Sequence, residues 1–254
     1  TPNRADCLGV RGVARDLAAA GYGTLKPLDT SAHEGSFDSP VTWRLDLDGA
    51  EHLAPLITGI AFRGVTNGPS PDWMARRLNA IGQRPISALV DITNYVMFDL
   101  GRPLHAYDID KIHGSELIVR QADGGEPLAA LNEKTYEMEA GMITIGDAEG
   151  VDDLAGVMGG ERTGVSDGTT GMFLEIAVFD PISVATTGRK LNLNSDARYR
   201  FERGLDSESP VWAAGHIARM VTEICGGEAS VPVTMGPGVD WKRSIFLGSG
   251  KVES

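Results

Sequence analysis

The stretch VDITNYVMFDLGRPLHAYD, residues 90–108, is the sequence feature that most constrains the fold. Gly101 and Pro103 interrupt any helical or strand period within it, since proline lacks the backbone N–H that a helix needs and glycine favours turns. The segment is therefore too rich in turn formers to be one helix. We expect the chain to reverse here and to bring the polar residues on either side of the break together.

Those polar residues are Thr93, Asn94 and His105. A hydroxyl, an amide and an imidazole on adjacent edges of a turn can bind an ester or carbonyl group and position a water molecule beside it. A purely structural interpretation stays open, in which Asn94 caps a turn and His105 fills a polar niche.

A glycine cluster follows in LAGVMGGE, residues 154–161, which contains Gly156, Gly159 and Gly160. Glycines let a backbone approach a ligand closely and present its N–H groups as donors. The segment lacks the GxxxxGK[ST] pattern of a phosphate loop, and its Gly-Gly-Glu ending puts a carboxylate where a phosphate site needs a cation. The alternative is a tight turn that serves the fold alone.

Glu175 lies in the apolar segment FLEIA, which is typical of a buried strand. Burying a carboxylate without a partner costs several kcal/mol, so we expect something to hydrogen-bond it. One candidate is an ion pair with an arginine further along the chain.

Composition indicates a folded piece of a larger protein. The 254 residues, 42% of them hydrophobic, can bury a sizeable core as one large or two small domains. The chain begins Thr-Pro, which suggests an excised or cleaved segment, and no apolar run approaches the roughly 20 residues that span a bilayer. Cys7 and Cys225 lie far apart, so we expect free thiols in a reducing cytosol.

The net charge of −12 argues against tight binding of nucleic acid by this chain alone. Basic residues nevertheless gather between Arg189 and Arg203, where they could meet a nucleic acid. Because Asp196 and Glu202 are interleaved with them, a solvated face with internal ion pairs is an equal alternative.

Periodicity and turn residues predict an α+β fold. Helices are expected over residues 8–18, where the apolar face should pack in the core, over 71–81, where Trp73, Leu78 and Ile81 should face the core, and over 209–224. The strands are expected at 41–47, 57–62, 116–120 and 142–145. Residues 248–254 are expected to be disordered.

Two other kinds of site are disfavoured. The five histidines show no HExxH or paired-cysteine spacing, so no metal site is expected. A GxSxG pattern occurs around Ser166, but turn-forming residues flank it where a nucleophile elbow needs a strand and a helix. We therefore expect a loop there.

The segments described above, with SDARYRFERGLD at 195–206 and the opening TPNRADCLGVRGVARDLAA, resemble the editing domain of the β subunit of bacterial phenylalanyl-tRNA synthetases. The resemblance implies a sandwich-like β core with flanking helices. The editing domain would cover residues 1–232, as one unit that can contain two closely packed subdomains. Residues 233–254 would begin the linker to the next domain.

The resemblance also assigns roles to residues of this chain. Thr93, Asn94 and His105 would surround the terminal adenosine and the ester, and Glu175 would accept the para-hydroxyl of tyrosine. The other residues of the substrate pocket would be Ala155, Gly156, Gly159, Ser195 and Ala197. Ser195 stands where some relatives have threonine, which keeps the hydroxyl and loses a methyl group.

The implied activity is hydrolysis of mischarged Tyr-tRNA(Phe) by a cytoplasmic ligase subunit. Its partners would be the α subunit and the acceptor end of tRNA(Phe), while ATP and magnesium would bind the complete synthetase and not this chain. Two alternatives remain: a catalytically inactive structural or tRNA-docking module, and a free-standing homologue that acts on another ester.

Overall fold

The structure, a computed structural model, describes residues 3–240, 242, 244–246 and 248. Local sequence sets several helix ends: the Asp180 side chain accepts the Ser183 N–H at 2.7 Å, and Gly101 ends a helix with a φ of 72°. The helices are α1 (Val10–Ala19), α2 (Asp72–Ala80), α3 (Ala88–Leu100), α4 (Pro181–Lys190), α5 (Asp196–Phe201) and α6 (Ser209–Cys225), with short 3-10 helices at Ala5–Cys7, Glu51–Leu53 and Ile109–Lys111.

The described strands form two main sheets and a hairpin. One sheet has the order β1-β4-β7-β8-β9, the other β11-β2-β10-β3 with β12 also paired to β2, and the hairpin is β5-β6. Their bounds are β1 (Thr42–Asp46), β2 (Leu56–Arg63), β3 (His105–Asp108), β4 (Glu116–Gln121), β5 (Pro127–Ala130), β6 (Lys134–Glu137), β7 (Ile143–Gly146), β8 (Val151–Leu154), β9 (Met158–Gly159), β10 (Gly171–Val178), β11 (Glu228–Ala229) and β12 (Val233–Met235).

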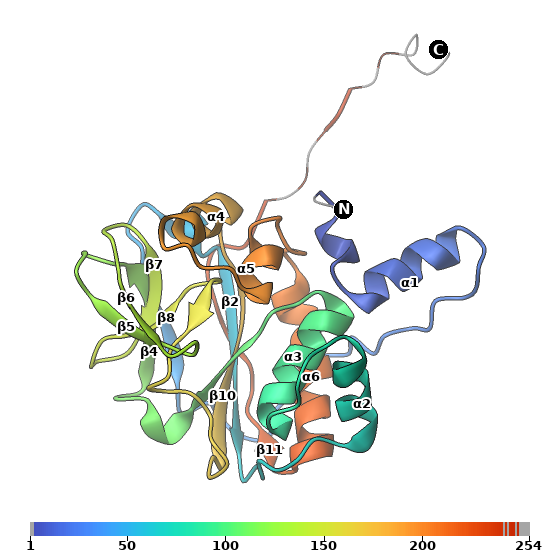
Figure 1. The fold of residues 1–254 in the computed structure, drawn as a ribbon, viewed down its shortest axis with the longest axis horizontal. Coiled ribbons are helices and arrows are strands. Elements are labelled where there is room, and N and C mark those ends of the chain that lie inside the picture. The colour runs from blue at the N-terminus through green and yellow to red at the C-terminus, as the bar shows by residue number, and fades with distance from the viewer. Residues whose placement is uncertain (1–2, 241, 243, 247, 249–254) are drawn as a thin grey trace.

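The β2-β10 sheet is the middle layer (Figure 1), with the β4-β7-β8 sheet on one face and α2, α3 and α6 on the other. Alternate residues of β10 serve the two faces: Phe173 and Ala177 pack toward the other sheet, whereas Leu174 and Ile176 pack toward the helices. The predicted α+β class with a sandwich-like core and flanking helices is confirmed. The alternation also places Glu175 between the two sheets.

Most predicted elements are present, but their burial differs in places. Leu78 of α2 is buried as expected, whereas Trp73 and Ile81 are exposed, and Val211 of α6 is exposed although its neighbours on the helical stripe are buried. The helix itself is confirmed, but the core assignment of Trp73 is wrong because Met74, which the pattern did not single out, occupies the core position. Ser70 does not cap α2, because its hydroxyl donates to Asp91 at 2.5 Å.

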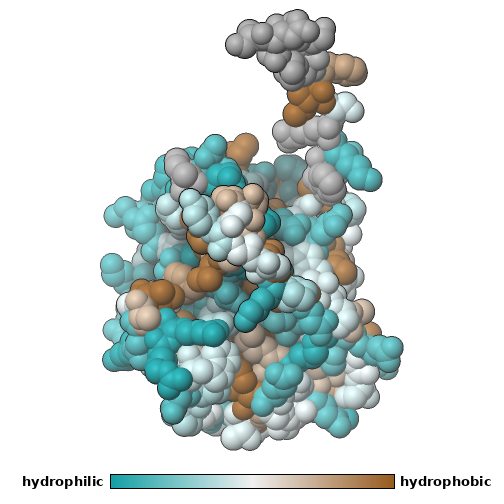
Figure 2. Space-filling model, turned by 90° about the vertical axis from the view of Figure 1, so that its right-hand side faces the viewer, coloured by the Kyte–Doolittle hydropathy of each residue, from teal (hydrophilic) through white to brown (hydrophobic). Residues whose placement is uncertain are grey.

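Helix α1 forms where it was predicted, but its expected role in the core is wrong. Val10 is 61% exposed and Leu17 is 51% exposed, and only Gly12 of the helix is buried. Gly12 packs so closely against Asp6 that a Cβ there would lie 1.6 Å from the Asp6 carbonyl oxygen. Figure 2 views this side of the molecule and shows hydrophobic groups at its surface. Amphipathic spacing predicted the apolar face correctly but cannot say what covers it.

The structure describes only some of the C-terminal residues for which predictions were made. Val233–Met235 pair with β2, so the sheet extends past residue 232, and the proposed domain boundary stays a prediction. Of the segment expected to be disordered, residues 249–254 lie outside the described residues. Among the described helices, none has the length and apolar character to cross a membrane.

Candidate functional site

His105 and Glu175 are neighbours across two strands. They are aligned partners in the antiparallel pair β3-β10, and Gly59 is aligned with Glu175 on the other side, in β2. Side chains of aligned partners project from the same face of a sheet. The imidazole and the carboxyl group therefore both lie on the face toward the second sheet, near its β8-β9 end.

Helix α3 brings Thr93 and Asn94 to the same place. The chain leaves the helix at Gly101, turns through Arg102 and Pro103, and enters β3 at His105. The predicted convergence through a turn is thus confirmed, and Thr93 and Asn94 lie within the helix that precedes the turn, which extends to Leu100.

The two polar residues of α3 differ in their partners. The Thr93 hydroxyl donates to the Val90 carbonyl oxygen at 2.7 Å. The Asn94 side chain has no hydrogen-bond partner among the described residues, which leaves its amide available to a ligand. The capping role considered for Asn94 is therefore not observed.

The glycine-rich segment forms the turn between β8 and β9. Gly156 has a φ of 69°, a conformation that other residues rarely adopt, and a Cβ there would lie 2.9 Å from the Phe179 ring. Gly159 is packed against His105, since a Cβ on Gly159 would lie 2.4 Å from the ring atom Cε1. Both glycines thus serve the turn and shape the space beside His105.

Ser195 joins this turn to α5. Its side chain accepts the Arg198 N–H at 3.0 Å as the cap of α5, and its hydroxyl donates to the Val157 carbonyl oxygen at 2.6 Å. The cap begins a helix whose first turn presents Ala197 beside the β8-β9 turn. Ser195 therefore has a structural role in addition to lining the space.

These elements enclose a cavity of about 310 Å³, which is within the range of small-molecule sites. All nine residues predicted for the site line it: Thr93, Asn94, His105, Ala155, Gly156, Gly159, Glu175, Ser195 and Ala197. The structure thus brings together five segments that are separated along the chain.

Burial strongly perturbs the pKa of Glu175 in the cavity. The residue is 6% exposed, and burial, with repulsion from Asp153, raises the pKa of its carboxyl to about 8. No hydrogen bond or ion pair joins it to another described residue, so the alternative of an ion pair with a later arginine is not observed among them. The described arginines after β10 that form ion pairs do so with other acids, and Arg102, from the turn before β3, is the positive charge that acts on Glu175.

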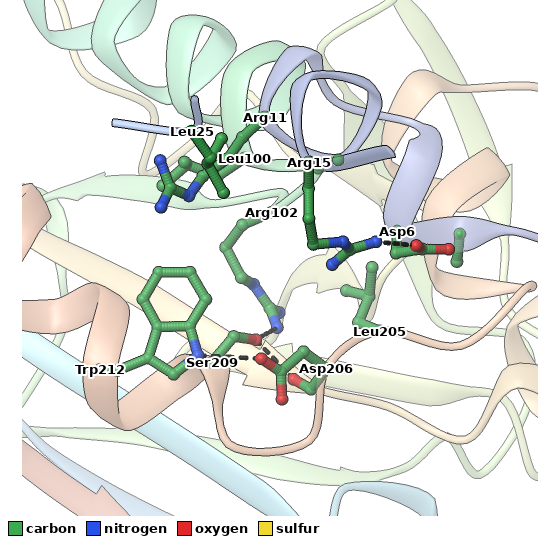
Figure 3. Close-up of a pocket in the computed structure, with 13 residues that line it drawn as sticks. Asp6, Arg11, Arg15, Leu25, Leu100, Arg102, Leu205, Asp206, Ser209 and Trp212 are labelled. Carbon is green, nitrogen blue, oxygen red and sulfur yellow. Dashed lines mark hydrogen bonds and ion pairs between the residues drawn. The ribbon is translucent and has the colours of Figure 1, made fainter. Parts of the chain in front are cut away.

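Arg102 lies beside a second cavity, of about 240 Å³, between α1, the end of α3 and the start of α6 (Figure 3). Its guanidinium is buried and donates to Ser209 Oγ at 2.7 Å and to the Ala177 carbonyl oxygen of β10. Burial lowers the Arg102 pKa to about 10, and Glu175 and Asp206 oppose that shift. Arg102 thus fixes the turn before His105 to the strand that carries Glu175, a role that the sequence did not reveal.

Asp153 is a functional candidate that the sequence analysis missed. It lines the same cavity, is buried, and has an Oδ1 atom 3.3 Å from His105 Nε2. Two adjacent acids at 152 and 153 usually indicate a solvated turn, but in β8 they project to opposite faces. An acid doublet inside a strand-length segment was the signal available in the sequence.

The other predicted sites have different outcomes. In the basic segment, Arg198 and Arg200 are buried and form internal ion pairs with Glu202 and Asp196, so these two do not face RNA, and an RNA-facing role of the other basic residues stays a prediction. The GxSxG segment around Ser166 is a loop, as predicted. The two cysteines are free thiols, as predicted.

One group of described residues has metal-ligand spacing, Asp6, Cys7 and Asp16, and it lies outside the 310 Å³ cavity. Arg4 forms ion pairs with both of these aspartates at 2.8 Å. The guanidinium already supplies the positive charge that a cation would bring.

Comparison with known proteins places the chain in a family. Residues 53–226, more than half of the chain, match the B3/4 domain model. The phenylalanine–tRNA ligase β subunit of Paramagnetospirillum magneticum is 52% identical over 253 residues, which are 99% of this chain and 32% of that protein. The β subunit from Ruegeria pomeroyi is 50% identical over 254 residues, 100% of this chain and 32% of that protein.

The chain thus spans about a third of the length of these relatives. Among solved structures, an N-terminal fragment of the phenylalanyl-tRNA synthetase β subunit from Pyrococcus horikoshii matches 75% of this chain and 59% of that chain, with 17% identity and a TM-score of 0.41. The family match and the relatives agree, and the chain belongs to the B3/4 domain family, in a form similar to a section of the phenylalanine–tRNA ligase β subunit.

Proposed function

We propose that the 310 Å³ cavity is an editing site that hydrolyses the ester between tyrosine and tRNA(Phe). The observation that carries the proposal is that Thr93, Asn94, His105 and Glu175 line one cavity. Family membership supports it, because the relatives are ligases for phenylalanine, and tyrosine differs from phenylalanine by one hydroxyl group. A synthetic site shaped for the phenylalanine ring rejects such a larger analogue only weakly, which creates the need for a second site.

Glu175 is the proposed selector for tyrosine. Its buried carboxyl has no hydrogen-bond partner among the described residues, so a para-hydroxyl placed there would gain a hydrogen bond that phenylalanine cannot make. With a pKa of about 8 the carboxyl is mostly protonated at pH 7; a phenol can accept from the protonated carboxyl or donate to it, and it can only donate to the ionised form. Phenylalanine would leave the polar group unpaired, a defect that can discriminate by about 10⁴-fold.

The proposed chemistry is attack of a water molecule on the ester carbonyl carbon. The new C–O bond forms to water, the bond to the ribose oxygen breaks, and the products are free tyrosine and uncharged tRNA. A proton leaves the water and the ribose oxygen gains one. His105 lies at the cavity surface to receive or orient that water proton, while Thr93 and Asn94 offer polar groups for the ester and the terminal adenosine.

The partners are proposed for the complete ligase. The net charge of −12 gives this chain little attraction for a polyanion, so productive docking of the tRNA would come from other parts of the β subunit and from the α subunit. ATP and magnesium would serve aminoacylation elsewhere in the ligase. This division predicts that the 254-residue chain hydrolyses the ester more slowly than the complete ligase does at the same tRNA concentration.

The test is hydrolysis of Tyr-tRNA(Phe) by the 254-residue chain and by the complete ligase, each with His105→Ala and the control His113→Ala. His113 is an exposed histidine paired with Glu149, outside the cavity. We expect a loss of about 10²-fold or more for His105→Ala and almost none for His113→Ala. Hydrolysis by neither unmodified protein would favour the structural or docking module, and equal effects of the two substitutions would remove His105 from the mechanism.

A further inference from the structure

Besides Glu175, the cavity contains a second buried acid, Asp153 in β8, whose side chain lies next to the His105 ring. Its Oδ1 atom lies 3.3 Å from His105 Nε2 and also accepts the Gly160 backbone N–H at 3.0 Å. The Nε2 atom is buried and makes no hydrogen bond to a described residue at this separation, and the Asp153 carboxylate is the polar group that faces it. An imidazole N–H enclosed in this way needs an acceptor, and Asp153 is the acceptor within reach.

We propose that Asp153 is the positioning residue of His105: it accepts the Nε2 proton, fixes the tautomer of the ring, and leaves Nδ1 unprotonated as the working atom. The inference concerns the ring itself, and only its catalytic consequence rests on the proposed function. Hydrogen bonds between catalytic groups are often long before substrate binds and shorten in the complex, which fits a separation of 3.3 Å.

The surroundings of the ring support this assignment. A Cβ on Gly159 would lie 2.4 Å from Cε1 and 2.8 Å from Nδ1, so the absence of a side chain at Gly159 keeps the Nδ1 edge open. On the opposite side the Tyr107 ring packs edge-on against the imidazole, with centroids 4.6 Å apart. The His105 side chain is 19% exposed, and because Nε2 is buried, this exposure belongs to the rest of the ring.

The groups around Asp153 act on its pKa in both directions. Burial raises the Asp153 pKa, and His105 and then Tyr107 oppose that shift. The Gly160 backbone N–H also favours the charged form of Asp153, whereas the neighbouring Asp152 and Glu175, across from His105 on β10, are acids that repel it. Arg162 adds a weaker contribution from outside the cavity.

The chemical consequence concerns which nitrogen can accept a proton. A neutral imidazole has one N–H and one bare nitrogen, and the hydrogen bond at one nitrogen decides the state of the other. With the proton on Nε2, Nδ1 can accept a proton from water as that water attacks an ester. With the proton on Nδ1, the ring can only donate a hydrogen bond from that nitrogen. The lone pair of Nε2 then faces the buried Asp153 carboxylate and cannot accept a proton from water in the cavity.

The direct test is the ¹⁵N NMR signature of His105 in the unliganded 254-residue chain and its variants. We expect the Nε2–H tautomer in the unmodified chain and a substantial Nδ1–H population in Asp153→Asn, because an amide can donate to Nε2. Asp153→Ala, which removes the acceptor altogether, provides a second variant if the amide substitution perturbs folding. An Nδ1–H ring in the unmodified chain, or an unchanged tautomer in both variants, would overturn the proposal.

Asp152→Asn is the matched control. Asp152 is the adjacent buried acid of β8, but it pairs with Arg162 at 2.7 Å and accepts the Thr163 hydroxyl at 3.1 Å, away from the cavity. Its substitution should leave the His105 tautomer unchanged. A tautomer shift of the same size in this control would mean that loss of any buried charge in β8 moves the ring, and would overturn the assignment to Asp153.

Kinetics of Tyr-tRNA(Phe) hydrolysis by the complete ligase supply a second readout. Asp153→Asn should lower kcat by about 10²-fold with KM nearly unchanged, because it alters proton transfer and not substrate binding. A change confined to KM would contradict a positioning role. If the unmodified ligase hydrolyses no ester, the proposed function fails, whereas the NMR result still decides whether Asp153 sets the state of His105.

Discussion

Glu175→Gln tests the electrostatics of the cavity through protein stability. Glutamine keeps the shape of the side chain and removes its ionisation. In the folded chain, burial and then repulsion from Asp153 raise the pKa of Glu175 from 4.5 to about 8, against the opposing charge of Arg102. In the unfolded chain the carboxyl ionises near its ordinary value.

The sign of the effect follows from which state holds the proton more strongly. Below pH 4.5 both states are protonated, and ionisation of Glu175 does not affect stability. As the pH rises toward about 8, the unfolded chain gives up the proton first, so the free energy of unfolding falls; above about 8 the loss is complete. At ~1.4 kcal/mol per pKa unit, the loss is about 3 kcal/mol at pH 7 and roughly 5 kcal/mol at pH 9.

Urea unfolding of the unmodified chain and Glu175→Gln at pH 5, 7 and 9 measures this loss. Titrating groups that do not interact with Glu175 affect both proteins equally and cancel in the difference, whereas Asp153 and Arg102 do interact with it. We expect the variant to be more stable by about 1 kcal/mol at pH 5 and by roughly 5 kcal/mol at pH 9. Glu137→Gln, at an exposed position of β6, controls for loss of a strand carboxyl. A stability difference for Glu175→Gln that is the same at pH 5 and pH 9 would refute the reasoning.

Three further predictions follow from packing and burial. Gly159→Ala places a methyl group 2.4 Å from His105 Cε1, so ester hydrolysis should fall by about 10²-fold, whereas Gly168→Ala, in open space, should match the unmodified chain in the same kinetic assay. Ser195→Ala removes the cap of α5 and should lower the free energy of unfolding by about 1–2 kcal/mol; an unchanged urea midpoint would contradict this. Burial raises the Cys225 pKa to about 11, so thiol labelling at pH 8 should be at least ~10²-fold slower in the folded than in the unfolded chain, and equal rates would disprove it.

Much of the site could be predicted because its parts have local signatures. The break at Gly101 and Pro103 required a reversal, and the structure places α3 and β3 on its two sides. Glu175 stood out as a charge in a strand, and strand alternation points it between the sheets. The resemblance to a family then assembled these pieces, since spacing alone cannot show which distant segments meet.

The residues that were missed depend on register and partners. Asp153 and Arg102 gain their roles from what lies across β8 and β10, which no local pattern records. Trp73 was assigned to the core although neighbouring Met74 fills it, because helical spacing leaves a rotation of about one residue undecided. The exposed face of α1 shows the same limit, since amphipathicity does not identify the covering surface.

The ratio of hydrolysis rates for Tyr-tRNA(Phe) and Phe-tRNA(Phe), measured with the complete ligase and its Glu175→Ala variant, tests the central claim most directly. Glu175 lies in the cavity without a hydrogen-bond partner among the described residues, so the account predicts a strong preference for tyrosine that collapses toward equality in the variant while ester hydrolysis persists. Equal rates in the unmodified ligase, or a preference for tyrosine that survives the loss of Glu175, would contradict it.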